Sequence, residues 1–255
     1  MTIPSYPVAL YHYTTIRSLA LILESRSIRF TRADKVNDPE EVKISDAPEI
    51  KKAVFLSCWT ASENESIPLW ALYASDTKGV RIRLSSNMFE SVGKPYESKY
   101  GRFLIINLGF LKNVVQRETD YLWIPYLFGP SKVDYTPENS ATVLRGKEIE
   151  VCKVGTIKLE HWKFEEEHRF IIFPDALWNS EMEIFQYIRD GAIKNPIIDE
   201  HVYIPLDPKI LDKIEVTMGP DAKDAEYCIV KALLEKYVKN GKILDSALKD
   251  KIRIN

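Results

Sequence analysis

The sequence predicts an α+β fold, with a single mixed-sheet domain and flanking helices that span residues 1–255. Segments with the apolar pattern of strands are mixed along the chain with segments of helical periodicity, which favours a mixed class. We find no internal repeat, no low-complexity tract and no clear linker. A chain of 255 residues suits one large domain and can bury a core without a metal or disulfide.

The N-terminal segment has the clearest element signals. Residues 9–13 are expected to form a first strand, and Thr14 or Thr15 is expected to cap a helix over residues 16–25. Apolar residues spaced i, i+3 and i+4 predict that one face of this helix packs on the core. These residues are Leu19, Ile22 and Leu23.

The later elements follow from apolar runs, prolines and glycines. Pro68 is expected to open a short helix. The Gly219-Pro220 pair is expected to break the preceding strand, and Asp221 to cap the last helix. The apolar stripe of that last helix includes Ile229, Leu233 and Val238. Residues 87–131 are expected to form one or two helices with irregular segments, and residues 139–159 a helix or loop. The other expected elements are strands over 28–31, 53–59, 80–84, 133–135, 162–173, 201–205 and 214–218, helices over 69–74, 181–189 and 222–237, and a polar turn over 36–41.

Composition excludes several classes of protein. The formal net charge of -2 offers no global attraction to nucleic acid or acidic membranes, although a local basic patch is compatible with it. The three cysteines form no CxxC pair, which predicts no metal site and a cytoplasmic location. We find no signal peptide, no membrane-spanning apolar run, no phosphate-binding loop, no dinucleotide-binding glycine pattern and no metalloprotease or serine-hydrolase motif.

Two aromatic groups are candidates for a ligand site. His12 lies between Tyr11 and Tyr13, so its ring could hydrogen-bond a ribose hydroxyl while a tyrosine stacks on a flat ring. Trp70 and Tyr73 are spaced i, i+3 and share a helical face that could line a pocket. Ordinary core packing is the alternative interpretation of both groups.

The segment of residues 162–173 combines charged and apolar residues. If it is one extended strand, Glu165, Glu167 and Arg169 share one face, and its charged end lies at the rim of a sheet. Such carboxylates could act as a general acid and base or stabilise a cationic transition state, and Arg169 would keep Glu167 ionised. A structural ion pair is the alternative.

These motifs together resemble a bacterial family known as a domain of unknown function. The shared elements are an aromatic-rich "YHYT" start, an "NDP-x-E" turn, a "W-x-x-Y…G" element, a "W-x-x-E-x-E-x-R" strand and a late "GP". In this chain they are residues 11–14, 37–41, 70–79, 162–169 and 219–220. The turn departs from the pattern, because Glu40 stands where an aromatic residue is common.

A second resemblance is to ADP-ribosyltransferases of the H-Y-E type, which implies an ADP-ribosyltransferase-like fold and NAD as substrate. It implies that His12 holds the ribose, that Tyr73 or Tyr13 stacks on nicotinamide, and that Glu167 is catalytic. Trp70 and Arg169 complete the candidate cofactor-binding set, and no metal is expected. The acceptor would be nucleic acid or protein, as in a toxin or antiphage effector, with no membrane partner.

Two other functions fit the same residues. A non-catalytic module could bind a nucleotide or a partner on the same aromatic surface. A Mg²⁺-dependent nuclease could use Glu165 and Glu167 together with Asp38 and Glu41 of the turn. The sequence ranks the NAD-consuming enzyme first, the binding module second and the nuclease third.

Overall fold

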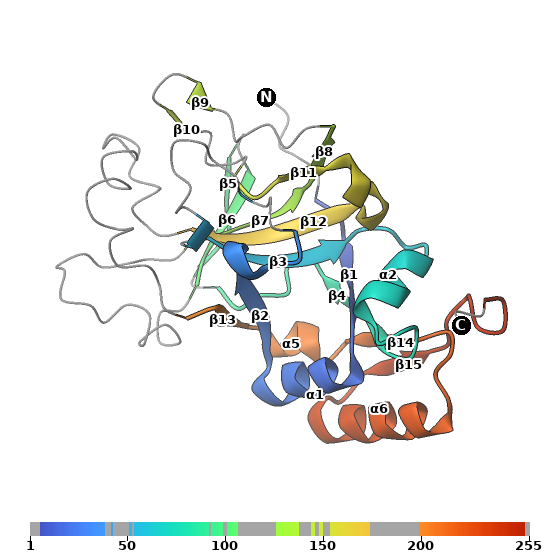
Figure 1. Ribbon diagram of the computed structural model, residues 1–255. Coiled ribbons are helices and arrows are strands. Elements are labelled where there is room, and N and C mark those ends of the chain that lie inside the picture. The colour runs from blue at the N-terminus through green and yellow to red at the C-terminus, as the bar shows by residue number, and fades with distance from the viewer. Residues whose placement is uncertain are drawn as a thin grey trace.

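A large mixed β-sheet forms the centre of the fold, with a few helices packed against it (Figure 1). The computed structural model describes residues 6–38, 42, 51–52, 54–91, 93–98, 101–106, 126–137, 144–145, 148–149, 154–173 and 199–252. The predicted α+β class is therefore confirmed. The helix predicted over residues 181–189 and the end of the turn, residues 39–41, lie outside the described residues.

The main sheet has the order β15-β14-β4-β1-β3-β12-β7-β6-β5, and β2 and β13 branch from β3. Its strands are β1 (Ala9–Thr14), β2 (Ser27–Arg32), β3 (Phe55–Thr60), β4 (Val80–Ser85), β5 (Tyr96–Ser98), β6 (Gly101–Ile105), β7 (Tyr126–Lys132), β12 (Glu167–Phe173), β13 (His201–Pro205), β14 (Glu215–Met218) and β15 (Lys242–Leu244). Two small sheets join β8 (Asp134–Thr136) to β11 (Ile157–Leu159) and β9 (Leu144–Arg145) to β10 (Glu148–Ile149).

The first helix, α1 (Ile16–Ser25), has the bounds that the sequence predicts. Thr15 caps it by accepting a hydrogen bond from the Ser18 backbone N–H. The predicted core face is buried, and it packs with the late helix α6 (Asp224–Tyr237) along the same side of the sheet (Figure 1). The part of the chain that the structure describes also contains the α-helices α2 (Ile67–Tyr73), with Pro68 in its first turn, and α5 (Pro208–Leu211). Within the described residues, no helix is long and apolar enough to cross a membrane.

Strand β3 is the junction on which the fold depends. On one edge it pairs fully with β12, but on the other edge it is shared by two strands. The end of β3 at Thr60 pairs with β1, and the beginning, at Phe55 and Leu56, pairs with β2. Helix α1 connects β1 to β2, and the pairing of these two strands with opposite ends of β3 leaves a split in the sheet over the middle of β3.

Two regions differ from the sequence prediction. The described parts of residues 87–131 form strands β5, β6 and β7 instead of helices, because apolar side chains there pack across strands: Phe103 lies opposite Phe128, with ring centroids 4.9 Å apart. The described parts of residues 139–159 contain β9, β10 and β11, where a helix or loop was predicted.

The last helix begins later than predicted. Asp221 does not cap it, because its carboxylate accepts a hydrogen bond from Thr77, and the helix starts at Asp224. Val230 and Leu234 form the buried face, whereas Ile229 is 51% exposed, so the predicted stripe is wrong at that position. The break before the helix is confirmed, because β14 ends at Met218. A larger residue does not fit at position 219, because a Cβ at Gly219 would lie 2.0 Å from the carbonyl oxygen of Thr77.

Candidate functional site

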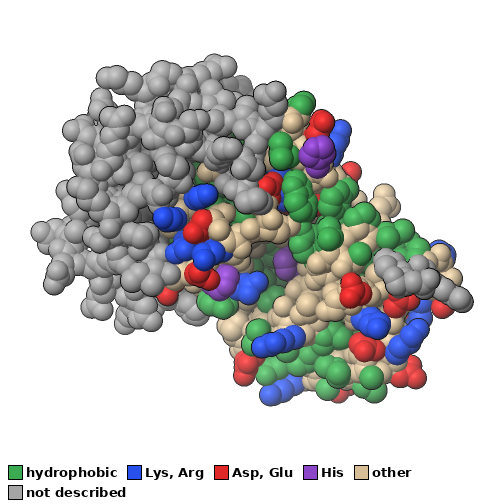
Figure 2. Space-filling view, viewed as in Figure 1, with side chains coloured by type: hydrophobic (Ala, Val, Ile, Leu, Met, Phe, Trp, Pro, Cys, Tyr) green, Lys and Arg blue, Asp and Glu red, His purple; other side chains and the backbone are tan. Residues whose placement is uncertain are grey.

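A cavity of about 530 Å³ opens where β1 and β2 part. This volume is in the range of pockets that hold nucleotides and other small ligands. Figure 2 shows a hollow on this face, with a histidine at its bottom and charged side chains gathered along one side. The residues of its wall that bear on function are His12, Ser18, Arg29, Thr31, Asn37, Cys58, Trp59, Tyr73, Lys158, Glu165, Glu167 and His201.

The register of the strands places most of this wall on one face of the sheet. Glu167 of β12 lies opposite Thr60 of β3, so these two side chains share a face of the sheet. Successive side chains on a strand alternate between faces, so Trp59 points to the other face. His12 and Trp59 belong to the other face, where their rings pack with centroids 5.1 Å apart. His12 therefore reaches the cavity through the split in the sheet.

The split also explains how His12 is held. Its ring Nδ1 lies 2.9 Å from the carbonyl oxygen of Cys58, on the part of β3 between its pairings with β1 and β2. An imidazole that donates from Nδ1 keeps Nε2 as an acceptor. Burial lowers the pKa of His12, and the positive charge of Arg29 lowers it further. The ring is therefore neutral near pH 7, with an acceptor nitrogen for a ligand hydroxyl.

This geometry predicts the protonation of His12. We expect the proton to lie on Nδ1 at pH 7, and the ring to titrate below the ordinary pKa of 6.5. Because the unfolded chain then binds more protons than the folded one, His12 should lower stability as the pH falls through 6.5. Two-dimensional ¹H–¹⁵N NMR of the imidazole across this pH range measures both properties, with His12→Gln to assign the signals. A proton on Nε2, or a pKa at or above 6.5, would contradict the prediction.

The carboxylates of the predicted motif form a buried network with two cations. Arg169 binds Glu167 through two hydrogen bonds, from Nε to Oε1 at 2.8 Å and from Nη2 to Oε2 at 2.7 Å. Lys158 binds Glu165 at 2.6 Å and Glu167 at 3.4 Å. All four residues are at most 5% exposed. Two negative and two positive charges therefore balance one another away from water.

The network separates the pKa values of its two carboxylates. Burial would raise the pKa of Glu167, but Arg169 and Lys158 outweigh it and lower the pKa to about 2. Burial and the neighbouring charge of Glu167 raise the pKa of Glu165. Glu167 is thus a fixed negative charge at the cavity wall at any physiological pH.

Tyr73 connects the network to the other side of the cavity. Its hydroxyl donates to Glu165 Oε1 at 2.6 Å and accepts from the Asn37 side chain at 2.6 Å. Burial and Glu165 raise the pKa of Tyr73, so the hydroxyl stays protonated. The ring comes from α2, lines the cavity and is held in position by these two hydrogen bonds.

The local structure of the motif differs from the prediction. Glu165 ends a 3-10 helix, Glu160–Glu165, and Glu166 has a left-handed backbone, with φ 44°. Only from Glu167 is the chain extended, and β12 lies in the middle of the sheet, between β3 and β7. The expectation of one extended strand over residues 162–173 is therefore wrong, because the chain is helical up to Glu165 and the strand begins at Glu167. Glu165 reaches Glu167 because the turn folds it back onto Lys158.

Two of the candidate cofactor-binding residues do not face the cavity. Trp70 is fully buried beside Tyr13 and donates a hydrogen bond to Glu65 at 2.9 Å. Arg169 is 1% exposed and is bound to Glu167 and to the carbonyl oxygen of Gly155. Core packing occupies the Trp70 side chain and ion pairing occupies that of Arg169, and neither residue is part of the cavity wall. Tyr13 borders the cavity but is 5% exposed, and its hydroxyl accepts from Ser66 N–H, so its ring has little free face.

Several cavity residues were missed by the sequence analysis. Arg29 and Thr31 alternate with buried Ile28 and Phe30 along β2, a pattern that marks one polar face and was visible in the sequence. His201 alternates in the same way on β13. Lys158 gave no such signal, because its segment was assigned to a helix or loop.

The described carboxylates of the cavity wall are bound by cations and are not grouped as metal ligands. Within the described residues, no group of three or more His, Cys, Asp or Glu side chains could hold a metal ion. Glu165 and Glu167 are bound by Lys158 and Arg169, and Glu41 lies outside the described residues. Nothing in this geometry supports the nuclease alternative.

Comparison of the chain with models of known protein families, with curated proteins and with solved structures found no match. The family and the activity implied by resemblance therefore stay predictions, and function must be argued from the cavity.

Proposed function

We propose that the cavity binds NAD and that the protein is an ADP-ribosyltransferase or NAD glycohydrolase. One observation carries the proposal: His12, Tyr73 and Glu167, which come from three separate elements, line one cavity of about 530 Å³. The H-Y-E resemblance names these three residues. The three residues meet in one cavity because β1 and β2, which helix α1 connects, part over the middle of β3.

Each of the three groups has a role that follows from its chemistry. Neutral His12 offers Nε2 to a hydroxyl of the ribose next to nicotinamide. The Tyr73 ring offers a flat apolar surface for nicotinamide. Glu167 is ionised, and a fixed carboxylate beside the anomeric carbon stabilises the positive charge that develops there.

The reaction would break the bond between the anomeric carbon and nicotinamide, whose nitrogen keeps the electron pair. A nucleophile then forms a bond to the anomeric carbon and loses its proton. Water as nucleophile gives hydrolysis, and a hydroxyl or amine of a nucleic acid or protein gives ADP-ribosyl transfer. An effector that modifies either acceptor would act as a toxin or in phage defence.

A second candidate function is nucleotide binding without cleavage. It is favoured by the state of Glu167, whose Oε2 accepts from both Arg169 and Lys158 and whose Oε1 accepts from Arg169. A carboxylate has about four lone-pair positions, so few remain for a substrate. In this case the network would serve to hold Tyr73 and the shape of the cavity.

Incubation of the full chain with NAD separates the two functions. The enzyme should release nicotinamide in amounts that exceed the protein, as measured by chromatography, with or without added RNA, DNA and protein acceptors. A binding module should raise the melting temperature with NAD or ADP-ribose and release no nicotinamide. If NAD is neither bound nor consumed, both proposals fail.

A further inference from the structure

One wall of the cavity is a polar face built from β2 and β13. In their antiparallel pairing His201 lies opposite Thr31, and Tyr203 lies opposite Arg29. Directly opposed residues share a face of a sheet, and so do residues two apart on one strand. These four side chains therefore point to the same side, while the residues between them are buried in the core.

Two polar groups on this face have no hydrogen-bond or ion-pair partner among the described residues. Arg29 is exposed and makes no hydrogen bond or ion pair with any described residue. His201 Nδ1 is buried, and no described residue is its hydrogen-bond partner. The nearby Lys35 is already paired with Glu200 at 2.6 Å. Arg29 is thus the available cation of this wall, next to an imidazole whose buried nitrogen lacks a partner.

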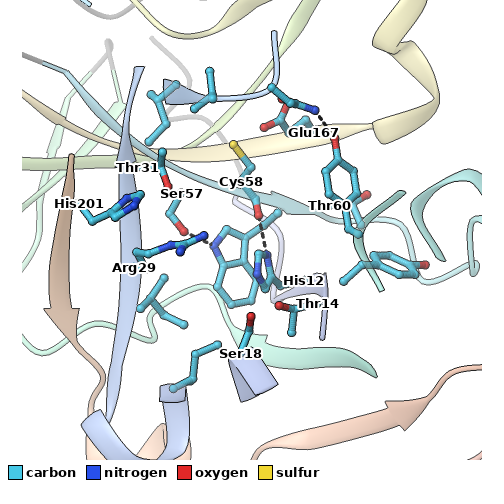
Figure 3. A pocket seen from close by; sticks show the side chains of 18 of the residues that line it. His12, Thr14, Ser18, Arg29, Thr31, Ser57, Cys58, Thr60, Glu167 and His201 are labelled. Atoms are coloured by element: carbon cyan, nitrogen blue, oxygen red, sulfur yellow. Dashed lines mark hydrogen bonds between the residues drawn. The ribbon is translucent and has the colours of Figure 1, made fainter. Parts of the chain in front are cut away.

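Arg29 also acts on the interior of the cavity. Figure 3 shows its side chain extending from β2 toward His12, with His201 beside it and Glu167 farther away, beyond His12 and Cys58. Burial lowers the pKa of His201, and the charge of Arg29 lowers it further, as it does for His12. The guanidinium is therefore within electrostatic range of both imidazoles.

We propose that Arg29 and His201, together with the hydroxyl of Thr31, form a phosphate subsite that binds the diphosphate of a nucleotide. A guanidinium presents parallel N–H donors that match phosphate oxygens, and hydroxyl and imidazole groups add donors of the same kind. The opposite wall carries the ionised carboxylate of Glu167, so a ligand with an anionic end and a sugar that becomes cationic fits in one orientation. The diphosphate lies at β2 and β13, and the glycosidic bond lies toward Tyr73 and Glu167.

This inference deepens the proposed function and rests on its assignment of a nucleotide to the cavity, but binding tests it separately from cleavage. Isothermal titration of the full chain with ADP, ADP-ribose and adenosine compares the same base with and without phosphate. Arg29→Gln should weaken ADP and ADP-ribose binding by about 10–100-fold, the effect of losing a charge-assisted hydrogen bond, and leave adenosine binding unchanged. Arg17→Gln, an exposed arginine of α1 outside the cavity wall, is the matched control.

The outcomes separate the two proposals. A wild-type chain that does not bind ADP, or an Arg29→Gln variant with unchanged ADP affinity, overturns the phosphate subsite even if NAD is cleaved. Arg29-dependent ADP binding without NAD cleavage supports the subsite and overturns the enzymatic proposal. An equal loss for ADP and adenosine would also overturn the subsite, because it would show a general change in the cavity. His201→Asn should weaken ADP and ADP-ribose binding in the same selective way.

Discussion

Replacement of Arg169 by methionine is expected to lower the free energy of unfolding by about 3–5 kcal/mol, because it leaves the buried Glu167 without its main partner. The variant also removes the donor to the Gly155 carbonyl oxygen. Urea unfolding followed by circular dichroism measures the change. Arg83→Met is the matched control: Arg83 lies on the same sheet and pairs with Glu215 at 3.1 Å, but its side chain is 39% exposed, so we expect a loss of no more than about 1 kcal/mol.

The pH dependence of this loss identifies its cause. In the wild type the pKa of Glu167 is about 2 against an ordinary value of 4.5, so its stabilisation is complete above pH 4.5 and is lost as the pH falls toward 2. Without Arg169, burial raises the pKa of Glu167, and its ionisation destabilises the fold as the pH rises. The difference between the two proteins should therefore shrink from pH 7 toward pH 4. A difference that stays constant would contradict an electrostatic origin.

Replacement of Glu167 by glutamine is expected to lower the rate of NAD cleavage by at least about 100-fold. The amide keeps the size of the side chain and can accept from Arg169, but it removes the negative charge that would stabilise the developing cation. Nicotinamide release under saturating NAD measures the rate. Glu166→Gln, the exposed neighbour, should leave the rate unchanged.

Loss of the charge also leaves Arg169 without its anion, so the folded state of the Glu167→Gln variant must be checked. Its ADP affinity provides this check, because the proposed phosphate subsite lies on other strands. A folded, ADP-binding variant that still cleaves NAD at more than a tenth of the wild-type rate would exclude Glu167 as a catalytic residue.

Local signals explain which elements could be predicted from the sequence. Helix α1 has both a capping threonine and an apolar face, so turn chemistry and periodicity agree there. The sequence of β4 alternates between apolar and polar residues, which is the pattern of a strand. The aromatic-rich segment before β7 lacks a clear period, and its strands exist because of cross-strand packing. The turn at Glu166 has no glycine or proline to mark it.

The candidate site was predictable in its residue types but not in its arrangement. His12, Tyr73 and Glu167 were selected by order along the chain, and the fold brings all three to one cavity. Trp70 and Arg169 are buried away from this cavity because of partners that are distant in sequence. Trp70 packs against Tyr13, and Arg169 donates a hydrogen bond to the carbonyl oxygen of Gly155. The alternation of Arg29 and Thr31 was present in the sequence, but its meaning depends on the pairing of β2 with β13.

The branching of the sheet at β3 has a mechanical consequence. The two walls that part there are joined by a single ten-residue helix, and that helix rests on α6 at the opposite side of the sheet from Glu167. We expect a substitution on α6 at this contact to shift α1 and so to change the spacing of the two walls, although no residue of α6 lines the cavity. Variation in access could thus arise far from the chemistry, while the charges that bind and react keep their places.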